Sequence, residues 1–189
     1  LPSIDRIDTI RFAEECVCAG GIGQQLVARL TEDGWRGTFI HRAVDNATLT
    51  HATVPELKEL QGLDAASLVQ AVRQAVGPDI SIRLDANQGW KPKEAVRLIR
   101  RMEDAGLDIE LVEQPVAAWD FEGLKLVTDS VDTDIMADES AFGLHDVFRL
   151  LSMRACDLIN VKLMKAGGLG PAAKIAALAE SAGVGCMMG

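Results

Sequence analysis

Four apolar segments of this chain end in a charged side chain, and they recur at nearly equal intervals. The segments "SIRLD", "IELVE", "DIMAD" and "LINVK" end at Asp85, Glu113, Asp138 and Lys162, which are separated by 28, 25 and 24 residues. A single acid at the end of a strand is most often a turn former or a helix cap, because Asp bonds to its own backbone. Four such ends in a regular series instead indicate a repeated structural unit.

Amphipathic helix patterns fill the intervals between these segments. The patterns lie at 64–77, 91–106, 120–129, 144–155 and 170–182. The first begins with a capping Asp64 and stops at Gly77, as helix start and stop signals require. The apolar segments lack strict alternation, which is typical of strands that are buried on both faces. The order of elements therefore predicts an α/β fold with a parallel sheet.

Two architectures accommodate such an array, the doubly wound open sheet and the (β/α)8 barrel. A nucleotide-binding open sheet carries G-x-G-x-x-G after its first strand, and neither "GGIG" at 20–23 nor "GGLG" at 167–170 completes that pattern. In a barrel the carboxyl ends of all strands converge on one mouth, so acids that end successive strands become neighbours. We therefore predict a (β/α)8-type TIM barrel.

The charge of the chain limits its partners. A net charge of −9 without a cluster of Lys or Arg argues against nucleic acid and against an anionic membrane surface. No apolar run approaches the roughly 20 residues of a membrane span. The N-terminal "LPSIDRIDTIRF" lacks the basic-then-apolar order of a signal peptide, so a cytoplasmic location is expected.

The cysteines and histidines carry no recognisable motif. The four cysteines, at 16, 18, 156 and 186, include no C-x-x-C pair, and reduced thiols are expected. His41, His51 and His145 are predicted at surface or helix positions and receive no role.

The three strand-end acids predict a metal site. Carboxylates gathered in one mouth repel one another unless a cation neutralises them. Oxygen ligands select a hard ion, Mg²⁺ before Ca²⁺. Lys162 shares the inward face of its strand with Asn160, and a second lysine, Lys165, follows closely. A desolvated lysine with a lowered pKa acts as a base. A structural ion pair is the alternative, and a Schiff-base aldolase would leave the acids unexplained.

Five stretches together resemble one family. The motifs "RLDANQGWKPKEAVRLIRRMEDAG", "IELVEQPV", "IMADES", "LINVKLMKAGG" and "GVGCMMG" are similar, in order and spacing, to those of the enolase superfamily. The resemblance covers about 64–189 and is strongest to the muconate-lactonizing-like branch, in particular to dipeptide epimerases of the L-Ala-D/L-Glu type.

The resemblance implies roles for individual residues. Asp85, Glu113 and Asp138 would bind Mg²⁺, and Lys162 would be one of the two acid/base lysines. The residues expected to support the ligands or bind substrate are Asn87, Gln114, Asn160, Lys165 and Met187. The family's second lysine belongs to a K-x-K pair on an earlier strand, which aligns with "ELKELQGLD"; Lys58 matches the first lysine of the pair and Leu60 replaces the second.

The implied activity is a 1,1-proton transfer on a dipeptide such as L-Ala-L-Glu, through an enediolate that Mg²⁺ stabilises. The substrate would be a dipeptide or an N-acyl amino acid, and a homo-oligomer is expected. Three alternatives stay open within the superfamily: cycloisomerase, o-succinylbenzoate synthase and N-acylamino acid racemase. A catalytically dead metal-binding relative is a fourth alternative, which Leu60 favours.

The resemblance also predicts the organisation of the chain. Residues 1–52 would be a reduced α+β capping domain, in which "IDRIDTIRF" and "LVARLTEDGWRGT" resemble strands, and residues 53–189 a partial barrel. A complete barrel takes about 250 residues and eight strands, whereas six strand candidates are present. We expect either pieces of a longer protein, which is the favoured reading, or a truncated relative.

Overall fold

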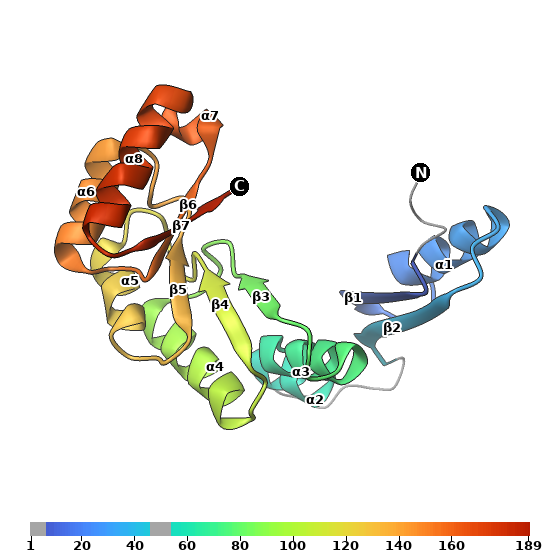
Figure 1. Ribbon diagram of the computed structural model, residues 1–189. Coiled ribbons are helices and arrows are strands. Elements are labelled where there is room, and N and C mark those ends of the chain that lie inside the picture. Colours follow the sequence, from blue (N-terminus) through green and yellow to red (C-terminus); the bar gives the residue numbers. More distant parts are fainter. Residues whose placement is uncertain (1–6, 46–53) are drawn as a thin grey trace. The chain divides into compact units, whose positions relative to one another are not determined.

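The computed structural model describes residues 7–45 and 54–189, and the chain divides into two compact units, residues 1–72 and 73–189 (Figure 1). The domain boundary predicted between residues 52 and 53 lies outside the described residues. Within the described ranges, no helix is both long and apolar enough to cross a membrane.

The C-terminal unit contains a five-stranded parallel sheet. Its strands are β3 (Ile82–Asp85), β4 (Ile109–Glu113), β5 (Asp134–Ala137), β6 (Leu158–Val161) and β7 (Gly185–Met188). They lie in the sheet in the same order as in the sequence, with every neighbour parallel. A doubly wound sheet reverses its strand order at a switch point. The unbroken order matches that of successive strands in a barrel.

Helices connect consecutive strands, as the sequence pattern predicts. They are α4 (Pro92–Asp104), α5 (Phe121–Thr128), α6 (Leu144–Met153), α7 (Leu163–Ala166) and α8 (Leu169–Ser181). Asp120 caps α5 by accepting a hydrogen bond of 2.8 Å from the backbone N–H of Gly123. The short α7 is absent from the predicted series, because four residues are too few to show a helical period.

The core of this unit lies between the sheet and its helices. Ile99 of α4, Leu150 of α6 and Ile159 of β6 are completely buried. On β5 the consecutive residues Ile135 and Met136 are also both completely buried, so this strand is covered on both faces. Burial of each such side chain stabilises the fold by about 1.5–3 kcal/mol. The prediction of strands buried on both faces is therefore confirmed for β4, β5 and β6, whereas β3 has exposed residues in alternation and β7 is mostly exposed.

The N-terminal unit contains a two-stranded sheet. Strand β1 (Thr9–Val17) leads through helix α1 (Ile22–Glu32) to β2 (Thr38–Val44), which pairs with β1 in parallel. Helices α2 (Val54–Leu60) and α3 (Ala65–Val76) follow, and α3 ends beyond the boundary of the unit. The helix predicted at 64–77 is thus confirmed.

Two strand predictions are wrong. The stretch "LVARLTEDGWRGT" contains the end of helix α1, which stops before Gly34 with a φ of +92°. The stretch "ELKELQGLD", predicted as a barrel strand with Lys58 and Leu60, lies largely in helix α2 and the turn after it. Leu, Lys and Glu are strong helix formers, and Gly62 at a φ of +65° ends this segment. Five of the six strand candidates therefore form strands of the parallel sheet.

Candidate functional site

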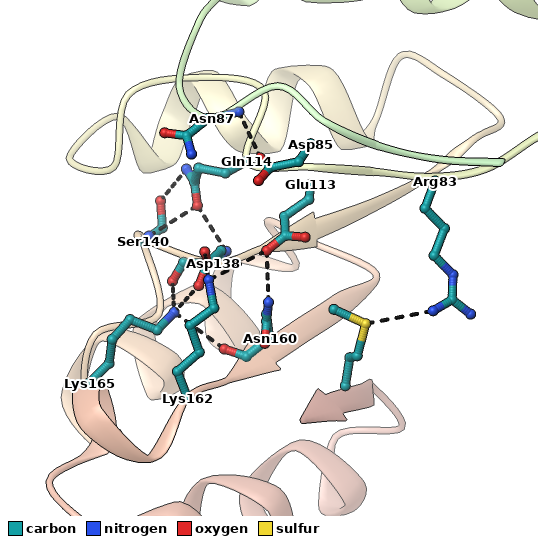
Figure 2. A network of polar contacts seen from close by, with 11 residues as sticks. Arg83, Asp85, Asn87, Glu113, Gln114, Asp138, Ser140, Asn160, Lys162 and Lys165 are labelled. Carbon is teal, nitrogen blue, oxygen red and sulfur yellow. Dashed lines mark hydrogen bonds and ion pairs between the residues drawn. The ribbon is translucent and has the colours of Figure 1, made fainter. Parts of the chain in front are cut away.

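Polar side chains gather at the carboxyl end of the five-stranded sheet (Figure 2). Asp85 and Glu113 are the last residues of β3 and β4, and they are direct partners in the strand register. Asp138 and Lys162 come immediately after β5 and β6. Because neighbouring parallel strands end at the same edge, the sheet places all four residues along that edge. The strand-end positions predicted from the sequence are those observed.

Two lysines converge on Asp138. Lys162 Nζ contacts Asp138 Oδ2, and Lys165 Nζ contacts Asp138 Oδ1. Lys165 Nζ also donates a hydrogen bond of 2.6 Å to the backbone carbonyl of Asp138. Burial by itself would raise the pKa of Asp138, but the two ammonium groups outweigh it and lower that pKa. This buried carboxylate is therefore held as an anion.

Glu113 lies in a different electrostatic environment. Its Oε1 accepts a hydrogen bond of 2.7 Å from Asn160 Nδ2 and lies 3.9 Å from Lys162 Nζ. Burial, followed by repulsion from Asp138 and Asp85, raises the pKa of Glu113 despite these contacts. Negative charge accumulates at this edge beyond what Lys162 neutralises, which is the electrostatic character of a cation-binding site.

The pKa of Lys162 is shifted in the direction opposite to the one expected for a base. Its hydrogen bond to Asp138 raises the pKa, and this outweighs the effect of burial. Partial burial of the side chain lowers the pKa, but less than the hydrogen bond to Asp138 raises it. In this arrangement Lys162 carries its proton, and the expectation of a pKa lowered by desolvation is wrong.

The side chain of Gln114 connects the segments that follow β4 and β5 through hydrogen bonds. The side chain is fully buried, and its backbone adopts a positive φ of 37°. Its Oε1 accepts hydrogen bonds from the backbone N–H groups of Asp138 (2.9 Å) and Ser140 (3.0 Å). Its Nε2 donates to Val116 O at 2.9 Å and to Ser140 Oγ at 2.8 Å. Gln114 thus determines where the backbone of Asp138 lies.

The remaining predicted residues lie at the border of this cluster or outside it. Asp85 Oδ1 accepts a hydrogen bond of 2.9 Å from the backbone N–H of Asn87, whose side chain is exposed. Met187 on β7 contacts Arg83 through its sulfur at 3.8 Å, not the strand-end acids. Lys58 belongs to the N-terminal unit, where its Nζ lies 2.5 Å from Glu15 Oε1. It is not among the residues that the C-terminal unit brings together.

Sequence reasoning missed the role of Ser140. Its Oγ accepts from Gln114 and donates to the carbonyl of Ala118 at 2.8 Å, so it ties the segment after β5 to the segment after β4. Ser140 stands in "ADES", two residues after Asp138. A serine so close to a strand-end acid is a signal for such a contact, but its partners are distant in sequence.

The donor atoms fit Mg²⁺ in kind. Asp85, Glu113 and Asp138 offer only carboxylate oxygens, which this ion prefers, and Asn160 has a buried Oδ1 without a hydrogen-bond partner. As the side chains are arranged, however, no three His, Cys, Asp or Glu residues in the described segments are close enough together to hold a metal. Both oxygens of Asp138 contact lysines, so coordination by Asp138 requires at least one of these ammonium groups to move aside.

Comparison with known proteins agrees with this arrangement. Residues 27–189 match the family described as enolase C-terminal domain-like. The chain therefore belongs to this family, within the enolase superfamily.

Particular relatives are epimerases. The chain is 61% identical over 121 residues to L-Ala-D/L-Glu epimerase of Bacillus subtilis. The aligned residues make up 64% of this chain and 33% of that relative. The chain is 44% identical over 172 residues to the hydrophobic dipeptide epimerase of Enterococcus faecalis, and these residues make up 90% of this chain and 48% of that relative. A substrate-liganded structure of the B. subtilis enzyme superposes with a TM-score of 0.65 at 44% identity, covering 92% of this chain and 45% of that one. The chain spans between a third and a half of the length of these relatives.

Proposed function

We propose that the protein is a Mg²⁺-dependent epimerase that moves the α-proton of a dipeptide such as L-Ala-L-Glu. The observation that carries the proposal is the position of Lys162, whose Nζ contacts one strand-end acid, Asp138, and lies 3.9 Å from another, Glu113. The similarity to dipeptide epimerases supports the substrate class. The five strands would be part of a complete (β/α)8 barrel, and residues 1–52 would belong to a reduced capping domain.

The three acids would hold the metal. A bound Mg²⁺ supplies positive charge that stabilises the negative charge developing on a substrate carboxylate when its α-proton leaves. Asp85, Glu113 and Asp138 would be its ligands, and Gln114 would position Asp138 through the hydrogen bond to the backbone N–H. Burial is the main cause of the raised pKa of Glu113, and repulsion from Asp138 and Asp85, which such an ion would relieve, adds to it.

Lys162 would move the proton on one face of the α-carbon. Because Asp138 raises its pKa, Lys162 carries a proton while it contacts Asp138, and it would have to lose that proton to solvent before acting as a base. Its neutral amine would then take the α-proton, and the resulting ammonium group would return a proton to the same face. Lys165, held by the carbonyls of Asp138 and Asn160 at 2.6 and 3.3 Å, would keep Asp138 ionised while Lys162 is engaged.

Inversion requires a second acid/base on the opposite face. Lys58 is a poor candidate, since helix α2 replaces the expected strand and Lys58 pairs with Glu15. Residues 73–189 alone would therefore exchange the α-proton without changing configuration. A protein that also has a lysine on the opposite face would show exchange and inversion together.

The proposal is tested by incubating the protein with Mg²⁺ and L-Ala-L-Glu in D₂O. Mass spectrometry measures deuterium uptake, and chiral chromatography measures inversion. Lys162→Ala should reduce deuterium uptake by roughly 10²- to 10⁴-fold, the usual contribution of a general acid or base. Lys174→Ala, which changes an exposed lysine on α8, is the matched control and should leave uptake unchanged. Uptake at the parent rate in Lys162→Ala would refute the assignment.

A second reaction has specific support. The chain is 41% identical over 116 residues to chloromuconate cycloisomerase of Cupriavidus necator. Cycloisomerisation uses the same mouth and the same metal chemistry but a different substrate. A screen of dipeptides, N-acyl amino acids and muconates separates the two activities, because only the first two classes contain an amino-acid α-carbon whose C–H proton can be exchanged.

A further inference from the structure

A chain of three reactive side chains lies in the N-terminal unit. Cys18 Sγ is 3.4 Å from His41 Nδ1, and His41 Nε2 is 2.6 Å from Glu14 Oε1. Cys18 directly follows β1, Glu14 is on β1, and His41 is on the paired strand β2. The parallel pairing of β1 and β2 is therefore what brings the three residues together.

The hydrogen-bonding partners determine the tautomer of His41. An ionised carboxylate only accepts hydrogen bonds, so Nε2 must carry the proton that is donated to Glu14. In the neutral imidazole, Nδ1 is then the acceptor and points at Cys18 Sγ. The thiol is thus the donor in this contact, and its proton has a base within reach. A nucleophile, a base and a group that orients the base are the parts of an activated thiol site.

Glu14 is held rigidly in its ionised form. Its oxygens accept hydrogen bonds from the backbone N–H groups of Ile22 (2.9 Å) and Gly23 (3.0 Å) at the start of α1. Burial would raise the pKa of Glu14, but these N–H groups and His41 together lower it. The stable negative charge keeps the proton of the imidazole on Nε2.

The glycines of "GGIG" make room for the pair. A Cβ on Gly23 would lie 2.4 Å from His41 Nε2, and a Cβ on Gly21 would lie 2.4 Å from Glu14 Oε1. Larger residues at either position would displace the imidazole or the carboxylate. This glycine motif does not complete the nucleotide-binding pattern, but its small residues leave the space that Glu14 and His41 occupy.

The thiol is open to small molecules. Cys18 is exposed, and together with His41 it lines a pocket of about 490 Å³ whose other walls include Gln24, Phe39 and Asp45. Asp45 gives the pocket an acidic side, so a neutral or cationic reagent fits better than an anionic one. Cys18 and Glu14 contact opposite nitrogens of the imidazole, which is unsuited to sharing one metal ion.

We propose that Cys18 is a nucleophilic thiol that exchanges with small neutral or cationic disulfides. His41 Nδ1 accepts the thiol proton, and Sγ attacks one sulfur of the disulfide. A new Sγ–S bond forms while the original S–S bond breaks, and the departing thiolate takes the proton from His41. One disulfide is consumed and one is formed, so no external oxidant or reductant is needed. Glu14 is the positioning residue, and Cys18 becomes reversibly modified.

The test compares Cys18 with its neighbour Cys16, which is also exposed. In the full chain with Cys186→Ser, adding Cys16→Ser leaves Cys18, and adding Cys18→Ser leaves Cys16. Cys156 stays silent in both, because burial raises the pKa of its thiol to about 12. The probe is 4,4′-dithiodipyridine, a neutral disulfide, and thiopyridone release is followed by absorbance. Cys18 should react at least roughly tenfold faster than Cys16 near pH 7, as expected for a base-activated thiol.

Substitutions then isolate the mechanism. His41→Gln should lower the rate at Cys18 to that of Cys16, whereas His145→Gln, an exposed histidine on α6, should have no effect. Lowering the pH to about 6 should increase the ratio of the Cys18 rate to the Cys16 rate, because the thiolate fraction falls faster for a thiol such as Cys16 that has no neighbouring base. Glu14→Gln should remove this increase. Equal rates at Cys16 and Cys18 in unmutated His41 protein would overturn the proposal, even if His41→Gln does not fold. A rate at Cys18 that is unaffected by His41→Gln in a folded protein would overturn it as well.

Discussion

The two units differ in how they hold their polar clusters. In the C-terminal unit, Asp138 and Lys162 directly follow strands whose residues, such as Ile135 and Ile159, are completely buried. In the N-terminal unit, the most buried apolar side chains, such as Leu30 and Trp35, remain 7% and 6% exposed. There the helix and the sheet are joined through Glu14, which links the start of α1 to His41 on β2.

The difference teaches which forces maintain each cluster. The strand-end acids depend on a core that has been packed from both faces of the sheet, so apolar packing keeps them in register. The Glu14 and His41 pair depends on hydrogen bonds and charge, which vary with pH. Changes in packing should therefore affect the C-terminal unit most, and changes in protonation should affect the N-terminal unit most.

The largest expected effect comes from the core of the C-terminal unit. Ile135→Ala should lower the free energy of unfolding by about 2–5 kcal/mol, since it leaves a cavity in a fully buried site. Leu30→Ala, the corresponding change in the N-terminal unit, should cost less because its site is partly open. Urea titration followed by hydrogen exchange measures both. Equal losses would remove the contrast between the units.

A smaller effect is expected on metal binding. Glu113→Gln removes one charge from the strand-end cluster and should weaken Mg²⁺ binding roughly tenfold or more, because ligand charge determines affinity for hard ions. Glu110→Gln on the same strand is the matched control, since Glu110 pairs with Arg83 at 2.8 Å. Titration calorimetry should find the control unchanged. Unaltered affinity in Glu113→Gln would contradict the assignment of this ligand.

The smallest effect is a dependence of stability on pH in the N-terminal unit. The pKa of Glu14 is lowered in the folded state, so the stability it contributes is present above the pKa of the unfolded chain. That contribution is lost as the pH falls through the lowered folded value. Hydrogen exchange at α1 should increase in mild acid, and Glu14→Gln should flatten this dependence.

The stability that Asp157 contributes in the C-terminal unit should change with pH in the direction opposite to that of Glu14. Burial raises the pKa of Asp157, so its protonated form is favoured by folding. The stability it contributes is present below the unfolded pKa and is lost as the pH rises through the folded one. Glu32→Gln changes an exposed acid at the end of α1 and serves as a control for Glu14→Gln in the N-terminal unit. Hydrogen exchange as a function of pH measures both effects, and equal changes produced by Asp157→Asn and Glu14→Gln would contradict the opposite signs.

Most of the C-terminal unit was predictable because its pattern repeats. A helix that begins near Pro92 and a strand that ends at Glu113 each follow from local spacing and helix signals. The expectation of a strand around Lys58 came from the resemblance and not from local spacing, and it is wrong. There the residues are themselves helix formers, and the local preference prevailed.

The sequence by itself determined the order of the βα elements and the positions of Asp85, Glu113, Asp138 and Lys162 at strand ends, because hydrophobic period and turn residues are local properties. Only the tertiary structure decided which charges meet. It placed both Lys162 and Lys165 against Asp138 and so raised the pKa of Lys162 where a lowered one was expected. It also joined Cys18 to His41 across the sheet. Contacts between residues distant in sequence arise from strand pairing and packing, which no local pattern encodes.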